Sequence, residues 1–105
     1  MAFQDNLAQM PDIARLSGLN VISADGQTLH HIPAAPGKLG SLKLYNALFE
    51  QFGGTLDAAA AEQGLIWFAE HLSDAEAHPG KHPNIDLLLK VRNENLTLSL
   101  QPIAA

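Results

Sequence analysis

The tripeptide Pro-Gly-Lys occurs twice in the chain, at residues 36–38 and 79–81, and each copy comes shortly before a segment with helical character. Pro-Gly suits the central positions of a type II turn, which would turn the following lysine and backbone N–H groups outward. Beside a helix N-terminus, such donors and the positive end of the helix dipole favour an anion. Candidate ligands of a phosphate or carboxylate are therefore Lys38, Gly40, Ser41 and Lys81.

Neither copy is a nucleotide-binding P-loop, because the first glycine of that motif, which four residues separate from Gly-Lys-Ser/Thr, is missing. The alternative interpretation is that both segments are sharp turns with a solvated lysine, since Pro-Gly is common in the turns of any fold. We predict that the two loops come together as the main polar pocket, with His78 and His82 beside the lysines.

The chain also has five histidines, which could act as general acids or bases near neutral pH. His30 and His31 are adjacent in an expected strand, so their side chains point to opposite faces of the sheet. One of the two should lie near the core or a groove, and we keep His31 as a candidate ligand. The remaining histidines fall at the end of a helix and in the loop after it: His71, His78 and His82.

Glu70, Asp74 and His78 would share one face of a continuous helix, and with His82 they resemble a zinc ligand set. Pro79 and Gly80 interrupt this spacing, and the alternative is a solvated helix face with histidines bonded in the loop. We therefore predict no metal site, with these residues as weak candidates, and leave cofactors open. No serine lies in a nucleophile-elbow sequence, so no catalytic residue is assigned.

The composition excludes several classes of protein. At 105 residues the chain should form a single domain over residues 1–105, and the absence of cysteine excludes disulfides and thiolate zinc sites. The formal net charge is −5 and the cations are scattered, so we expect no binding to nucleic acid or to an anionic membrane surface. With no long apolar run and no basic leader at the N-terminus, we expect a cytoplasmic protein.

Hydrophobic periodicity and turn residues predict the elements that must position these side chains. Asp25-Gly26 between two β-prone runs predicts a hairpin over residues 19–32, and the alternation of residues 96–101 predicts a further strand. Helices are expected from Phe3 to Met10, from Ser41 as N-cap to Phe52, from Asp57 as N-cap towards His71 or beyond, and from Asn84 to about Arg92.

These elements predict an α+β fold, with a small three-stranded, mostly antiparallel sheet formed by the hairpin and the C-terminal strand and packed against about three helices. The exposed edge at Leu96–Leu100 could pair with a second copy to give a homodimer. The core should consist mostly of Leu42, Tyr45, Phe49, Phe52, Leu65, Phe68, Ile85, Leu88 and Leu89.

Two segments that include the Pro-Gly-Lys copies resemble a family of small bacterial proteins that is a domain of unknown function. They read His-Ile-Pro-Ala-Ala-Pro-Gly-Lys-Leu-Gly-Ser-Leu from residue 31, and His-Pro-Gly-Lys-His-Pro-Asn-Ile-Asp from residue 78. The resemblance spans nearly the whole chain and implies a bacterial, cytoplasmic, single-domain protein. It carries no assigned activity, so no residue role follows from it.

The residues themselves favour a non-catalytic binding or interaction module with an anion-binding pocket for a small molecule. The alternative is a small histidine-dependent enzyme, with or without a metal, that acts on an anionic small molecule. Convergence of His31, His78 and His82 on Glu70 or Asp74 in one cleft would favour the enzyme.

Overall fold

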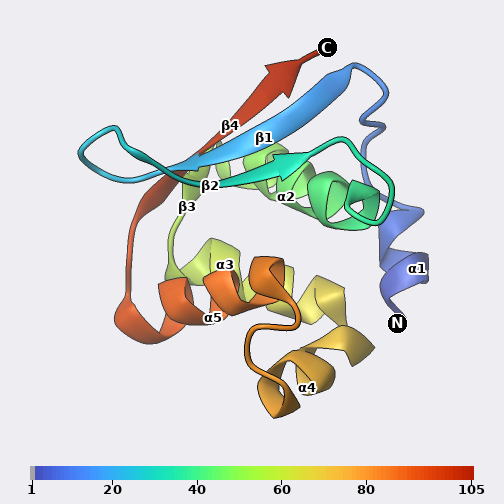
Figure 1. Cartoon of the computed structure of the whole chain (residues 1–105), viewed down its shortest axis with the longest axis vertical. Helices are drawn as coiled ribbons and strands as arrows, with labels where there is room; N and C mark the ends of the chain where they lie inside the picture. Colours follow the sequence, from blue (N-terminus) through green and yellow to red (C-terminus); the bar gives the residue numbers. More distant parts are fainter. Residues whose placement is uncertain (1) are drawn as a thin grey trace.

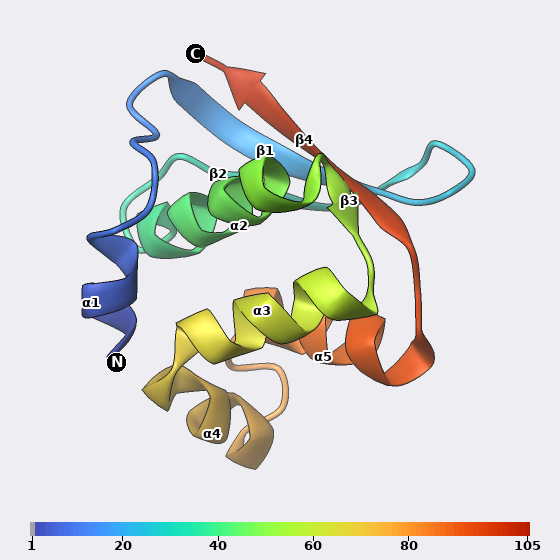
Figure 2. The same cartoon turned by 180° about the vertical axis from the view of Figure 1, so that it is seen from behind.

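A four-stranded antiparallel sheet and five helices make up the computed structural model, which describes residues 2–105. The strand order is β2-β1-β4-β3. In Figures 1 and 2, α2 lies against one face of the sheet, α3 and α5 form the next layer, and α4 lies farthest from the sheet. The elements are α1 (Phe3–Leu7), β1 (Leu16–Ile22), β2 (Thr28–Pro33), α2 (Leu39–Phe52), β3 (Thr55–Leu56), α3 (Ala58–Phe68), α4 (Glu70–Ala77), α5 (Pro83–Glu94) and β4 (Leu98–Ala104).

The α+β class and the antiparallel sheet are confirmed, whereas the predicted numbers of strands and helices were wrong. The hairpin forms as β1 and β2, and Gly26 in its turn has a φ of 90°, which glycine adopts without strain. The extra strand β3 has only two residues, so it shows no alternation that a sequence pattern could reveal.

The C-terminal strand pairs with β1 as expected but runs over residues 98–104 rather than 96–101. Its other side meets β3, and the N–H of Leu100 donates to the carbonyl of Gly54 at 2.8 Å. The edge expected to be free at Leu96–Leu100 is therefore largely paired within the chain, and β2 is an edge strand of the sheet. Pro102 lacks a backbone N–H, and its nitrogen faces the same side of β4 as the N–H of Leu100, because residues two apart in a strand point the same way. β3 pairs only with Leu98 and Ser99, so the proline removes no hydrogen bond between β4 and β3.

Several predicted helix boundaries were also wrong, among them the end of the first helix, which lies at Leu7 and not at Met10. The single helix expected from Asp57 towards His71 is divided at Ala69, whose φ is 53°, into α3 and α4. Asp57 does cap α3, since its carboxylate accepts the N–H of Ala60 at 2.9 Å. Helix α2 begins at Leu39 with Lys38 as N-cap, so Gly40 and Ser41 lie in its first turn rather than before it.

The core is built around α2, which is buried on two sides. Six of the nine predicted core residues are buried, and Phe49, Phe52 and Leu89 are partly buried against them. Leu44, Ala47 and Leu48 are also buried, because α2 lies between the sheet and the layer of α3 and α5. Over residues 2–105, every helix is too short or too polar to cross a membrane.

Gly64 allows α3 to approach its neighbours closely. A β-carbon placed on Gly64 would lie 2.7 Å from a methyl group of Leu88 in α5 and 3.0 Å from one of Leu48 in α2. The contact with Leu88 is shorter than packed carbon atoms tolerate, the one with Leu48 is tighter than most such contacts, and both neighbours are fully buried. The glycine that weakens helix propensity in the sequence is thus needed for packing.

We predict that Gly64→Ala lowers the free energy of unfolding by about 1–3 kcal/mol, the usual cost of overpacking a core. In an exposed helix the same change would raise stability by up to about 1 kcal/mol, because alanine has the higher helix propensity. Urea denaturation measures the difference, with Gln63→Ala on the same helix as the control. Stabilisation by Gly64→Ala would contradict the close approach of α3.

Candidate functional site

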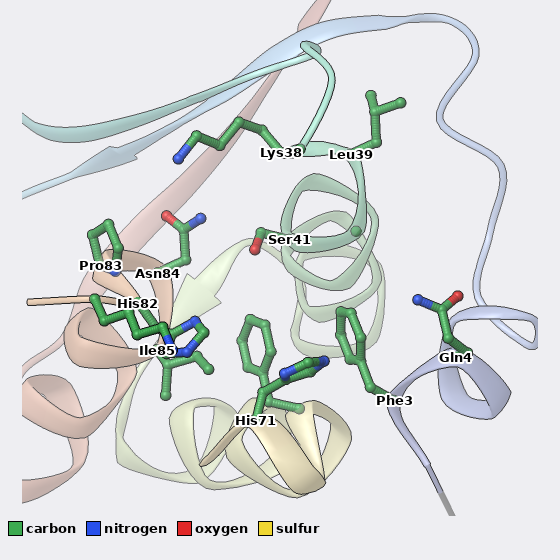
Figure 3. A pocket seen from close by; sticks show the side chains of 14 residues that line it. Phe3, Gln4, Lys38, Leu39, Ser41, His71, His82, Pro83, Asn84 and Ile85 are labelled. Atoms are coloured by element: carbon green, nitrogen blue, oxygen red, sulfur yellow. The ribbon is translucent and has the colours of Figure 1, made fainter. Parts of the chain in front are cut away.

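The two Pro-Gly-Lys loops line one cavity of about 380 Å³. Its walls come from the start of α1, the start of α2, the residues around the α3–α4 junction, and the loop that leads into α5. Figure 3 shows it with Lys38 and Ser41 on the α2 side, His82 and Asn84 on the α5 side, and Phe3 and His71 below. Cavities of this size commonly bind small molecules.

Two helix N-termini meet at this cavity. In α2 the first backbone bond runs from the N–H of Leu42 to the carbonyl of Lys38 at 3.0 Å, so the N–H groups of Leu39, Gly40 and Ser41 precede it. In α5 the N–H of Asn84 is in the same position, because Pro83 has no N–H. Within residues 2–105, these four donors have no hydrogen-bond partner, which is the usual condition of a helix start that water or a ligand satisfies.

The two lysines differ in their surroundings. The ammonium of Lys81 lies 3.1 Å from the carboxylate of Asp74, whereas no ion-pair partner of Lys38 is found in the described part of the chain. In Figure 3 the Lys38 side chain extends across the cavity towards the side of α5. Lys38 is therefore the cation that is available to a ligand, and the charge of Lys81 is largely offset.

Asp74 on α4 is the centre of a charged cluster. Its carboxylate lies 2.6 Å from Nε2 of His82, 3.1 Å from the ammonium of Lys81 and 3.9 Å from Nε2 of His78. The hydrogen bond from His82, and then the one from Lys81, lowers the pKa of Asp74 to about 2. Because the carboxylate is ionised and can only accept, Nε2 of His82 is the donor in this bond.

Aromatic rings form the floor of the cavity. Phe3 stacks on Phe68 with ring centroids 5.4 Å apart and meets the edge of His71 at 4.9 Å. The N–H of Phe3 donates to the carboxylate of Glu70 at 2.8 Å, and this bond lowers the pKa of Glu70. Helix α1 is thus fixed over the end of α3, and Phe3 also packs against Gly40 in the first turn of α2, so the aromatic side of the cavity adjoins the start of α2.

Asn84 connects the cavity to the interior of the protein. Its backbone carbonyl accepts the hydroxyl of Tyr45 from α2, and its side-chain oxygen lies 2.6 Å from Nε2 of His30 on β2. Tyr45 is completely buried, and burial raises its pKa, so it stays protonated and donates. These bonds hold the first turn of α5 against both α2 and the sheet.

The structure brings together most, but not all, of the residues that the sequence singled out. Lys38, Gly40, Ser41, Lys81 and His82 line the cavity. His78 is exposed beside Asp74 and is not part of the lining. His31 lies on the sheet face away from α2, bonded to Asn20 at 2.7 Å, and His30 is the inward member of the pair.

The weak metal candidates do not form a ligand set. Glu70 is bonded to the backbone of Phe3, and Asp74 is bonded to Lys81 and His82. Across residues 2–105, no three histidine or acidic side chains are grouped in a way that could hold a metal ion.

Sequence reasoning missed Phe3, Gln4, His71 and Asn84 as residues of the cavity. Phe3 and Gln4 belong to a short N-terminal helix whose position depends entirely on tertiary contacts. Asn84 follows Pro83 at the start of α5. Its position in the first turn of a helix, next to the second lysine loop, is the sequence signal that could have identified it.

Comparison with known proteins identifies a family but no residue roles. Residues 3–102 match a family model described as "Uncharacterized protein conserved in bacteria (DUF2322)". No curated protein and no solved structure matches the chain. The resemblance stated from the sequence is thereby confirmed.

We predict that the ion pairs of Asp74 make stability depend on acid pH. The pKa of Asp74 is lower in the folded protein, at about 2, than its ordinary value of 3.8. Its contribution is therefore present above about pH 4 and is lost as the pH falls towards 2. Urea denaturation at pH 6, 4 and 2 should show that wild type and Asp74→Asn differ at pH 6 and converge at pH 2.

Glu76→Gln on the same helix is the matched control, since Glu76 is exposed and no ion pair of it is found in residues 2–105. It should follow the wild type throughout. A difference between wild type and Asp74→Asn that stays constant from pH 6 to pH 2 would contradict the assignment.

Proposed function

The chain belongs to this bacterial family, and from its geometry we propose that it is a non-catalytic binding module whose cavity takes a small anion, a phosphate or a carboxylate. The observation that carries the proposal is the meeting of two helix N-termini at one cavity. Four backbone N–H groups without partners in residues 2–105 lie at these two helix starts, whose residues line the cavity. Helix N-termini attract anions through such donors and through the dipole.

The side chains around these donors support the same ligand. Lys38 supplies a positive charge without a carboxylate partner in the described residues, and Ser41 supplies a hydroxyl that points into the cavity in Figure 3. His71 and His82 add ring nitrogens to the lining. The net charge of −5 does not oppose this, because salt screens distant charges beyond about 10 Å.

The second candidate function is a small histidine-dependent enzyme acting on an anionic small molecule. It is favoured by the bond between His82 and Asp74, since a carboxylate that orients an imidazole at a cavity is typical of general acid–base sites. Binding ranks first for two reasons. Asp74 also binds Lys81, and His31 and His78 lie outside the cavity instead of converging with His82.

The proposal includes the cellular location and the assembly of the protein. We expect a cytoplasmic protein. A homodimer that pairs two strand edges would use β2, because β3 covers much of the edge of β4 at Leu96–Leu100.

Inorganic phosphate is the probe that tests this function. We expect it to raise the melting temperature of the wild type in a concentration-dependent way, as any ligand of the folded state does. Lys38→Ala should raise the Kd for phosphate about fivefold or more, the loss expected for a hydrogen bond to a charged group near solvent. Isothermal titration calorimetry at low salt measures the Kd for phosphate of the wild type and of Lys38→Ala.

Lys90→Ala is the matched control, since Lys90 is also exposed, has no ion-pair partner in residues 2–105 and lies outside the cavity. It should leave the Kd for phosphate unchanged. Absence of phosphate binding, or equal weakening by the two substitutions, would contradict the proposed site.

A further inference from the structure

A second cavity of about 560 Å³ adjoins the first. It lies between α1, the segment that leads into β1, the loop after β2 and the start of α2. Its lining is mostly aliphatic, in contrast to the N–H donors, lysines and ring nitrogens of the first cavity. The apolar residues are Leu7, Ala8, Ile13, Ala14, Leu16, Ala34 and Leu39.

The two cavities share a boundary. Gln4, Leu39 and Gly40 line both of them. In Figure 3, Gln4 and Leu39 lie on the side of the first cavity that faces away from His82 and Asn84. Phe3 and Leu7 pack against Gly40, with side-chain atoms 3.2–3.4 Å from where its β-carbon would be, so a flexible ligand that reaches both cavities passes over the exposed side chains of Gln4 and Leu39.

At this boundary, the side chain of Leu39 presents an apolar surface to solvent and is not packed into the core. Its side chain is 49% exposed, and it is one of three large exposed apolar side chains in residues 2–105. It is also the first residue of α2, so its backbone N–H is one of the donors at the first cavity. One residue thus presents an N–H for an anion and an aliphatic side chain beside it.

We infer that the ligand is an amphiphile, an anionic head group on an aliphatic chain. The head occupies the cavity between the two helix starts, and the chain crosses Leu39 into the aliphatic cavity. This inference rests on the proposed function and names the class of its ligand. Alkyl carboxylates and alkyl phosphates both have this chemistry, and the affinities measured below show which of the two head groups the cavity prefers.

The polar residues of the second cavity do not provide a better place for the head group. Lys43 lies there, but Asp12 is in the same lining and its negative charge opposes an anion. Asp12 already accepts the N–H of Ala14 at 3.0 Å. The unpartnered N–H groups of the two helix starts belong to residues that line the first cavity.

The first test is a chain-length series measured by isothermal titration calorimetry with hexanoate, octanoate, decanoate and octyl phosphate. Each pair of added methylene groups should lower the Kd about tenfold, somewhat less than complete burial would give. Acetate and inorganic phosphate measure the head group alone. Octyl glucoside has the same octyl chain as octyl phosphate but a neutral head, and it should bind at least about tenfold more weakly than octyl phosphate, the loss expected for a charged hydrogen bond.

The second test uses variants of the residues along the proposed path of the aliphatic chain. Leu39→Ser should weaken octanoate about fivefold or more relative to acetate measured on the same variant, because it removes apolar surface next to the head group. Leu29→Ser is its matched control, since Leu29 is 52% exposed on β2 and lines neither cavity. Ala34→Trp should fill the aliphatic cavity and abolish the gain with chain length, whereas Ala77→Trp, also exposed, should preserve it.

Each outcome separates this inference from the proposed function. If phosphate binds through Lys38 but octanoate binds no more tightly than acetate, the amphiphile is wrong and the anion site stands. If octanoate is weakened by Lys43→Ala and not by Lys38→Ala, the head lies in the second cavity and the inference is overturned. If neither phosphate nor any alkyl anion binds, both proposals fail.

Discussion

The bonds of Asn84 are the interaction on which the site depends. Its carbonyl accepts the hydroxyl of buried Tyr45, and its side chain meets His30. These contacts join α5, α2 and the sheet at a single residue, and leaving a buried partner unsatisfied would cost about 1–3 kcal/mol. Since Asn84 is also the second residue of α5, the same contacts fix the direction in which its free N–H points. The start of α5 is thereby held opposite the start of α2.

The structure gives different surroundings to the two lysines of the repeated tripeptide. Both follow Pro-Gly and both lie at the same cavity. Lys81 is paired with Asp74, which also fixes the ring of His82, whereas Lys38 has no such partner in residues 2–105 and extends over the cavity. The second loop is thus stabilised by its charges, and the charge of the first loop is the one that the proposed function assigns to a ligand. The proposal is compatible with an acidic protein, because the field near the helix starts is set by neighbouring groups.

Local chemistry made much of this fold predictable, and tertiary packing accounts for what was missed. Asp25-Gly26 and the alternation near residue 98 indicate the hairpin and the C-terminal strand because turn conformation and strand period are local properties. The break at Ala69 has no glycine or proline to announce it, and the two-residue strand β3 exists only through its pairing with β4. The lysine loops could be proposed from a repeated tripeptide, but which of two adjacent histidines faces inward depends on strand register, which the sequence leaves open.

The most direct test of an anion between two helix starts observes the backbone donors themselves. In a ¹⁵N-labelled sample titrated with inorganic phosphate, the account predicts saturable shifts at the amides of Leu39, Gly40, Ser41 and Asn84, all with one Kd. Amides of Lys90 and its neighbours in the last turns of α5 should stay in place. Shifts confined to other surfaces, or different constants for the α2 and α5 amides, would contradict a shared site.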